Sequence, residues 1–151
     1  MSILAWSHEL SVQITSIDLE HRRLFDLLKK LYDAIVVGCS RATLNTIVTD
    51  LLKVAEGHFE NEEALMKDHG YPGYASHLAE HEKIAEGVKT LVAALTAGKL
   101  VDKPDIALLP AQWLYSHIRS HDKLYMHFLM QSMGGNEQRM EKVPVSAEAA
   151  P

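Results

Sequence analysis

The sequence predicts an all-α protein, an antiparallel up-down-up-down four-helix bundle, on three observations. The 151 residues fit one domain, and hydrophobic residues make up 47% of them, which is enough for a packed core. Apolar residues recur every three or four positions through four long segments, the period of an amphipathic helix, and no strand-like alternation competes with it. Short breaks separate these segments, and helices joined by short loops pack antiparallel.

The first two helices are predicted over about 16–37 and 41–68. Thr15 is expected to cap the first helix, with Asp18 three residues later as in a capping box, and Gly38 to Ser40 ends it. Both helices carry one continuous apolar stripe that is expected to face the core. The apolar members of the two stripes are Ile17, Leu24, Leu28, Leu31 and Ile35, then Leu44, Ile47, Leu51, Ala55 and Leu65.

The third helix is predicted over about 74–97, after a turn signal at 69–73. The fourth is expected to reach Met133, but two starts are open. Either Pro104 is its first residue and Pro110 kinks it, or it begins near Pro110. The apolar stripe members are Tyr74, Ile84, Val88, Leu91 and Leu95, then Trp113, Leu114, Leu124 and Phe128.

The chain is expected to divide into a folded domain, 1–133, and a flexible C-terminal tail, 134–151, that contains Pro, Ala and Glu. The first residues lack a helical pattern, and Trp6, Val12 and Ile14 are expected to form an N-terminal arm that lies on the bundle. The N-terminus does not have the basic start and long apolar run of a signal peptide, and no stretch has membrane-spanning length. These features predict a cytoplasmic protein without membrane insertion.

Charge and cysteine content narrow the function further. The net charge is −5 with histidine neutral, and no block of Lys or Arg stands out, which argues against nucleic acid as a partner. The single cysteine, Cys39, excludes an intramolecular disulfide and fits a reducing compartment. We interpret it as an incidental thiol.

Polar residues within the apolar stripes are the most informative feature. Each unpartnered buried imidazole or carboxylate costs a few kcal/mol, and a domain stable by roughly 5–15 kcal/mol does not absorb that cost repeatedly. A bound metal compensates for it, because its binding energy adds to the folding energy. Six polar residues take positions where Leu or Ile is expected: His21, His58, Glu62, His77, His81 and His117.

The spacing supports a metal site. His58 and Glu62 are one turn apart, as are His77 and His81, so each pair lies on one helical face, about 40° apart. Imidazoles with few carboxylates suit iron, copper or zinc. Glu63 falls off the stripe and is expected to be solvated. The remaining histidines at positions 8, 69 and 127 have no clear place in a site.

A competing motif also covers the third helix. His77 to His81 matches H-x-x-E-H, a zinc-protease signature, with Glu80 as its acid. That chemistry would leave His21, His58 and His117 unexplained, so we disfavour it.

Four segments of the chain carry these polar residues in a distinctive order: Ile17 to His21, His58 to Met66, Tyr71-Pro72 followed by His77 and His81, and Trp113 to Ile118 with Asp122. They resemble the hemerythrin family, specifically its single-domain bacterial members, and the resemblance spans roughly residues 6–129. The resemblance implies a non-haem di-iron centre, with all seven ligand positions filled by the expected residue types. It implies that His77, His81 and His117 hold one iron, that His21 and His58 hold the other, and that Glu62, Asp122 and an oxo or hydroxo group bridge them.

Helical spacing disagrees with the resemblance at one ligand. Asp122 is five residues after His117, about 140° away on an ideal helix, whereas His121 is one turn away. A one-residue bulge near Ser120 would reconcile the two, because such bulges occur at functional sites. The sequence allows such a shift, because Tyr125 and Leu129 can face inward as well as Leu124 and Phe128. We therefore expect Asp122.

Ligand counting gives one open position. Two six-coordinate irons have twelve places, of which five imidazoles, two bridging carboxylates and one bridging oxygen fill eleven. The vacant place is on the iron held by two histidines, and an open position distinguishes a reactive metal site from a structural one. The resemblance implies that O2 binds there reversibly. Leu24, Leu114 and Ile118 lie within one turn of ligands and are expected to form a dry oxygen pocket.

The expected function is therefore oxygen storage or delivery by a monomeric non-enzyme, with an oxygen-consuming oxidase or oxygenase as a possible recipient. An oxygen or redox sensor that acts through a partner protein is the alternative. Peroxide or nitric-oxide chemistry and iron storage rank third. Ferritin-like oxidases use Glu-x-x-His pairs, and this chain contains none.

Overall fold

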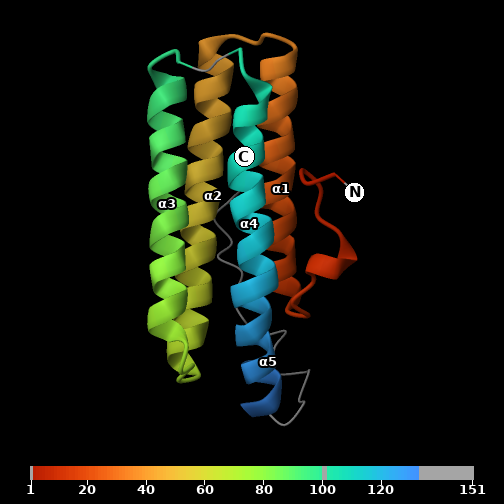
Figure 1. Ribbon diagram of the computed structural model, residues 1–151, viewed down its shortest axis with the longest axis vertical. Coiled ribbons are helices and arrows are strands. Elements are labelled where there is room, and N and C mark those ends of the chain that lie inside the picture. Colours follow the sequence, from red (N-terminus) through yellow and green to blue (C-terminus); the bar gives the residue numbers. More distant parts are fainter. Residues whose placement is uncertain (1, 100–101, 133–151) are drawn as a thin grey trace.

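The computed structural model describes residues 2–99 and 102–132, and within them it confirms the predicted bundle (Figure 1). Three long helices come first: α1 (Thr15–Val36), α2 (Arg41–Asp68) and α3 (Tyr74–Thr96). The fourth rod is composite. It contains α4 (Leu108–His117), a π-helical turn (Ile118–Asp122) and α5 (Lys123–Ser132), one after another without a break. The predicted tail and Met133 lie outside the described residues.

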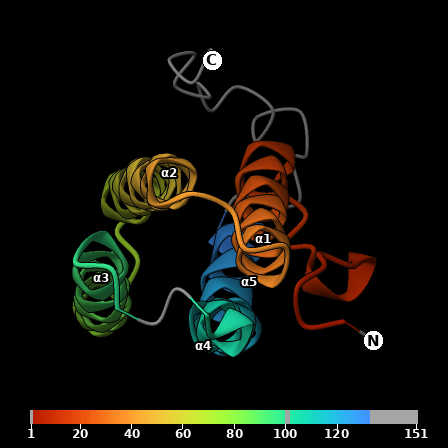
Figure 2. The same cartoon turned by 90° about the horizontal axis from the view of Figure 1, so that it is seen from above.

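The four rods surround a common core. α1 packs against α2, α2 against α3, and α4 against both α3 and α1, which closes the ring of neighbours (Figure 2). The N-terminal arm, with a short 3-10 turn at His8–Leu10, lies beside α1 (Figure 1). Its residues Leu10, Val12 and Ile14 are buried, and the Arg22 guanidinium lies 4.0 Å above the Trp6 ring. No helix among the described residues combines the length and apolarity that crossing a membrane requires.

The predicted cap of the first helix is wrong. α1 begins at Thr15 itself, so Ile14 is the N-cap residue and no side chain caps this end. Asp18 instead binds the arm: it accepts hydrogen bonds from the Ser11 hydroxyl at 2.5 Å and from the Val12 amide at 2.8 Å. Asp18 is in the first turn, where the helix dipole favours a negative charge. The same carboxylate therefore supports the helix start and fixes the arm on the bundle.

Two prolines lie at the start of the fourth rod, and neither interrupts its helices. Pro104 opens a 3-10 turn, Pro104–Ala107, and α4 follows directly at Leu108. Pro110 is the third residue of α4, in the first turn, where backbone N–H groups have no intrahelical acceptor. The missing N–H therefore costs no helical hydrogen bond, and of the two predicted starts the one near Pro110 is closer to the structure.

Two residues predicted to face inward do not. Leu124 is 62% exposed, because the π-helical turn inserts one extra residue and so rotates α5. Tyr125 and Leu129 take the inward positions and are buried. Trp113 is 37% exposed and lies over Gly87 of α3, with a ring carbon 2.5 Å from where a Cβ would stand. Tyr74 and Ile84, and Phe128 on α5, are only partly buried.

Candidate metal centre

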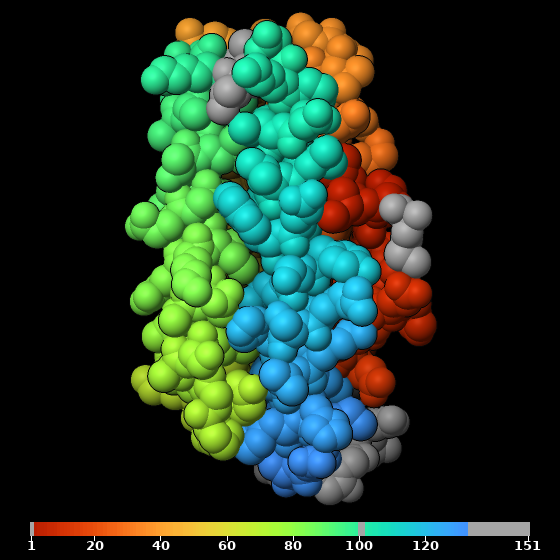
Figure 3. Space-filling model, viewed as in Figure 1, coloured from red at the N-terminus to blue at the C-terminus, as the bar shows by residue number. Residues whose placement is uncertain are grey.

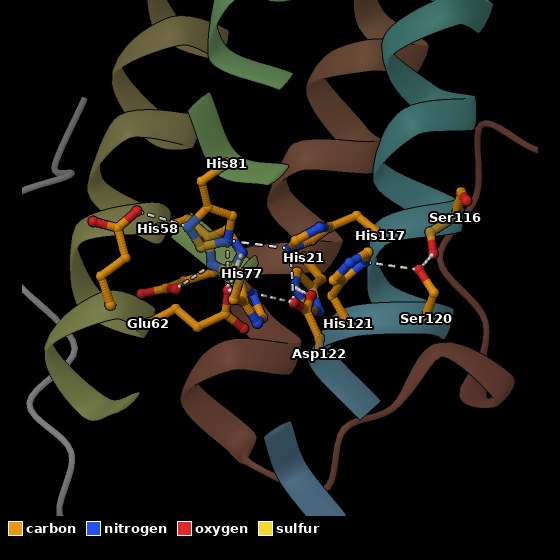
Figure 4. Close-up of polar contacts among 12 residues, drawn as sticks. His21, His58, Glu62, His77, His81, Ser116, His117, Ser120, His121 and Asp122 are labelled. Carbon is orange, nitrogen blue, oxygen red and sulfur yellow. Dashed lines mark hydrogen bonds and ion pairs between the residues drawn. The ribbon is translucent and has the colours of Figure 1, made fainter. Parts of the chain in front are cut away.

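Seven polar side chains meet in the middle of the bundle and form what we call the cage (Figure 4). All are at most 3% exposed, and every rod contributes at least one of them. Their sources are α1 for His21, α2 for His58 and Glu62, α3 for His77 and His81, and the fourth rod for His117 and Asp122. Large apolar residues fill the core on both sides of the cage, so solvent does not compensate for these polar groups.

The cage divides into two overlapping groups of potential metal ligands. Glu62, His77, His81, His117 and Asp122 each offer one ligand atom, and these atoms lie within 4.8 Å of one another. His21, His58, Glu62 and Asp122 form a second group by the same measure. Glu62 and Asp122 belong to both groups. The arrangement is that of two adjacent cation positions that share two carboxylates.

The contacts inside the cage are close, but few of them are hydrogen bonds. Asp122 Oδ1 lies 2.8 Å from His117 Nε2 and 3.0 Å from His77 Nε2, and Asp122 Oδ2 lies 3.2 Å from His21 Nε2. Despite these distances, neither oxygen has a partner with hydrogen-bond geometry. His81 Nε2 faces His117 Nε2 at 3.1 Å, so one of the two nitrogens presents a lone pair.

These contacts test whether the donor set fits a metal. Ligand nitrogens and oxygens converge at short distances with angles unsuited to hydrogen bonds, and His21 Nε2 and His58 Nε2 are buried without a partner. Convergent lone pairs stripped of water are costly unless a cation lies among them. Five imidazoles and two carboxylates suit iron, copper or zinc better than calcium or magnesium. The residues present therefore fit a pair of transition-metal ions.

The π-helical turn brings Asp122 into the cage. It advances the helix by one residue between His117 and Asp122, so that both side chains are buried and point toward each other. The widened turn loosens the backbone ladder, and the Ser120 hydroxyl donates to the Ser116 carbonyl at 2.7 Å in compensation. His121, the residue that spacing alone favours, stays outside the cage, partly buried.

Two further carboxylates orient cage histidines from outside. Glu20 accepts from His58 Nδ1 at 2.7 Å and is itself held by the Asn61 amide at 2.7 Å. Glu63 accepts from His81 Nδ1 at 2.7 Å. Each contact fixes the ring so that Nε2 faces the cage, as carboxylates behind metal-bound histidines do.

The prediction that Glu63 is solvated is therefore wrong: its side chain is 24% exposed and bound to His81. Glu20 and Asn61 had no assigned role. The sequence does contain a signal for both carboxylates. Glu20 directly precedes the cage residue His21, and Glu63 directly follows the cage residue Glu62, so each lies at the edge of the inward-facing stripe of its helix. Only the packing of neighbouring helices shows which edge faces a histidine.

The cage also shifts the pKa values of its members in the metal-free chain. Burial and Asp122 would raise the pKa of Glu62, but the close contacts with His77 and His81 lower it to about 2. Burial would lower the pKa of His77, but Asp122 and Glu62 raise it to about 9. Glu62 therefore stabilises the fold above its ordinary value of 4.5 and loses that effect as pH falls toward 2. His77 stabilises it below 6.5 and loses that effect as pH rises through 9.

The three residues predicted to form the oxygen pocket are buried in one hydrophobic cluster. Leu24 is 3% exposed, Leu114 is 5% exposed and Ile118 is fully buried. Leu24 is one turn from His21 on α1, and Leu114 and Ile118 flank His117. The three side chains therefore belong to the apolar core, close in sequence to the cage residues His21 and His117.

The remaining histidines and Glu80 lie outside the cage. His69 Nδ1 bonds the Leu65 carbonyl at the end of α2, His8 packs against Trp6, and His127 is exposed on α5. Glu80, the acid of the H-x-x-E-H motif, pairs with Lys83 at 2.8 Å on the surface. The motif therefore does not place its acid beside its histidines, which counts against the zinc-protease alternative.

The fold and the cage define a class: a four-helix bundle with a buried site for two metal ions that share carboxylates. Residues 12–129 match the family model of the hemerythrin HHE cation binding domain. The chain belongs to the hemerythrin family, as its sequence predicted.

Individual relatives agree with this assignment. The chain is 30% identical over 125 residues to a bacteriohemerythrin of Stenotrophomonas maltophilia, a match that covers 83% of this chain and 80% of the relative. It is 32% identical over 133 residues to a bacteriohemerythrin of Pseudomonas aeruginosa, covering 88% and 86%. A myohemerythrin of Theromyzon tessulatum is 28% identical over 120 residues, covering 80% and 88%.

A solved structure shares the architecture. The crystal structure of a leucine-to-phenylalanine mutant superposes with a TM-score of 0.75 at 28% sequence identity. The match covers 83% of this chain and 95% of that one. Family and fold are therefore supported independently, by sequence and by three-dimensional similarity.

Proposed function

We propose that this protein stores molecular oxygen or delivers it to oxygen-consuming enzymes. Its site is a non-haem di-iron centre that binds O2, as the family and the buried cage of imidazoles and carboxylates indicate. The observation that supports the proposal most strongly is the sharing of two carboxylates between two ligand groups. When bound, the irons supply the electrons and the open coordination position that O2 requires.

We assign the ligands by the two groups. His77, His81 and His117 would hold one iron, and His21 and His58 the other, which leaves the second with the open position. Glu62 and Asp122 would bridge both. This assignment uses every polar side chain of the cage and leaves none to be buried without a partner.

The protein residues around the site have separate tasks. Glu20 and Glu63 hold His58 and His81 in the orientation that a metal needs, at 2.7 Å each. Leu24, Leu114 and Ile118 would exclude water from the side of the open position. Such a dry wall would keep water and proton donors away from the open position, which favours reversible binding.

The decisive experiment is to load the protein with iron, reduce it without air and then admit air. A coloured oxygenated form that fades under vacuum and returns with air is the expected result, together with two irons per chain. Irreversible oxidation in the first cycle would refute reversible binding. His58→Gln is expected to lose iron and colour, and His127→Gln on the exposed face of α5 is the matched control.

Non-enzymatic action, a monomeric state and a cytoplasmic location complete the proposal. Steady-state turnover of added peroxide would contradict the first, a dimer in size-exclusion chromatography the second, and cell fractionation tests the third. An oxidase or oxygenase partner is expected to appear in a pull-down with the oxygenated protein. None of the relatives named above is described as a sensor, so storage or delivery remains first.

A further inference from the structure

A solvent-open groove of about 250 Å³ lies between α3 and α4, directly outside the cage. It follows the seam between the green and teal surfaces of Figure 3. Side chains of α3, α4 and the π-helical turn line it, the apolar Ile84 and Trp113 together with six polar residues: Glu80, Lys83, Ser116, His117, Ser120 and His121. The groove is distinct from the proposed oxygen wall, which is apolar and belongs to the core.

His117 connects the groove to the cage. It is the cage residue that lines this groove in the described part of the chain. Its Nε2 faces Asp122 at 2.8 Å, while its Nδ1 is buried without a hydrogen-bond partner. Glu20 and Glu63 hold the corresponding nitrogens of His58 and His81. Among the described residues no carboxylate does so for His117, so its Nδ1 is an unused nitrogen at the boundary between groove and cage.

Hydrogen bonding fixes which ring nitrogen of His121 carries the hydrogen. The Ser120 hydroxyl donates its hydrogen bond to the Ser116 carbonyl at 2.7 Å. Ser120 Oγ is therefore the acceptor in its 2.9 Å contact with His121 Nδ1, which must carry a hydrogen (Figure 4). In a neutral imidazole the other nitrogen, Nε2, then carries the lone pair, as a metal ligand requires.

His121 stands next to two members of the three-histidine group. Its ring stacks on His117 with centroids 5.2 Å apart and planes at 11°, and its centroid is 5.9 Å from that of His77. Glu80, on α3, lines the same groove as His121. An imidazole lone pair and a carboxylate therefore stand at the outer side of His117, on one solvent-open groove.

We propose that this groove is the route by which Fe(II) enters and leaves the cage, with His121 Nε2 and the Glu80 carboxylate as its transient ligands. The inference rests on the proposed di-iron function. Every cage ligand is at most 3% exposed, so a hydrated ion must exchange waters for protein ligands before it reaches them. An outer site with one imidazole and one carboxylate lets that exchange proceed in steps, and His117, which belongs to both the groove and the cage, is the next ligand inward.

Lys83 distinguishes an iron route from a purely structural role, because its removal should change the rate of iron uptake in the opposite direction to removal of Glu80. Its ammonium pairs with Glu80 at 2.8 Å and is 73% exposed. It competes with an incoming cation for the same carboxylate and repels it. Removal of Lys83 is therefore expected to speed iron uptake, whereas removal of Glu80 slows it.

The test measures both directions of metal exchange on the full chain. Uptake is followed without air after mixing metal-free protein with Fe(II), and release is followed from the reduced iron-loaded protein with a coloured Fe(II) chelator. A residue on the route lowers the barrier in both directions. Its loss must therefore slow uptake and release by the same factor and leave the affinity and the two-iron stoichiometry unchanged.

Four variants distinguish the outcomes. Glu80→Gln is expected to slow both rates roughly three- to tenfold, the effect of one charge on a divalent ion a few ångströms away in a watery groove. His121→Gln is expected to slow them at least as much, while its amide can still donate to Ser120. Lys83→Gln is expected to speed them. Glu82→Gln, an exposed acid on the same helix, is the matched control.

Unchanged rates in both Glu80→Gln and His121→Gln would overturn the proposal. A change in release alone, with a matching loss of affinity, would also overturn it, because it would mark these residues as supports of the finished site. Melting temperatures identify a variant that fails to fold. In that case Lys83→Gln, at an exposed position, still tests whether the rates of iron uptake and release rise as expected. Iron content and the reversible colour test the proposed function separately from the route.

Discussion

The carboxylates behind the cage histidines offer the sharpest test of the proposed assignment. In Glu20→Ala, the buried His58 ring keeps its Nδ1–H but loses the acceptor at 2.7 Å. An unsatisfied buried donor costs about 1–3 kcal/mol. Loss of a carboxylate behind a metal-bound histidine lowers metal affinity by about 10–100-fold, which equals roughly 1.4–2.7 kcal/mol. The two independent magnitudes agree, so we expect a loss of affinity in that range.

The position of each carboxylate predicts which iron is affected. Glu20 supports His58, a proposed ligand of the iron with the open position, and Glu63 supports His81 of the three-histidine group. Glu20→Ala should therefore weaken the oxygen-binding iron, and Glu63→Ala the other. Glu20→Gln retains an acceptor and should lose less. Asn61→Ala, which only frees Glu20, should cost about 0.5–1.5 kcal/mol.

The assay is an anaerobic titration with Fe(II), read as two binding steps, followed by oxygenation. Glu60→Ala, an exposed acid on the same helix as Glu63, is the control and should titrate as the unmodified protein does. Two irons bound with unchanged affinity in both alanine variants would refute the reasoning. So would loss of both steps together in each variant, because it would show that the carboxylates do not act on separate irons.

Three further predictions address the pocket, the protonation and the packing. Leu114→Asn should leave iron bound but speed autoxidation, because a polar side chain admits water; an unchanged rate of colour loss in air would contradict the pocket. Because the pKa of His77 is raised to about 9 in the metal-free chain, iron binding at pH 7 should release its proton, which a pH indicator in weak buffer detects, and iron affinity should rise with pH up to about 9. Gly87→Ala should destabilise the fold by about 1–3 kcal/mol, because its Cβ would stand 2.5 Å from the Trp113 ring. Gly57→Ala, with open space around it, should stabilise it by about 0.5–1 kcal/mol, and thermal unfolding separates the two.

Periodicity was sufficient for the fold because the helices are long. The predicted bounds of α2 are the observed ones and those of α1 differ by one residue at each end, since glycine and a strong turn mark the ends of these helices. It was insufficient at the cap, where Asp18 had two possible partners: the start of its own helix or the arm. Which of them it binds depends on where the arm packs, and the local sequence does not contain that information.

Periodicity was also insufficient to predict which residues of the fourth rod face inward after His117. A 3.6-residue period places His121 and Leu124 on the inner face, and the π-helical turn moves Asp122 and Tyr125 there instead. Helical spacing alone carries no sign of that turn. The bulge near Ser120 was predicted only because the family resemblance requires Asp122, and the π-helical turn at Ile118–Asp122 confirms it. The turn places Asp122 close to three histidine nitrogens in the cage.

The sequence by itself determined that this chain is a bundle with polar residues buried in each stripe, because burial without partners is too costly to be accidental. It also carried the family resemblance that the comparisons confirmed. Only the tertiary structure decided what surrounds those polar residues: Glu20 and Glu63 behind His58 and His81, and His121 outside the cage in the groove that Glu80 also lines. Helical spacing fixes the face of one helix, whereas a metal cage depends on how four helices are rotated and shifted against one another.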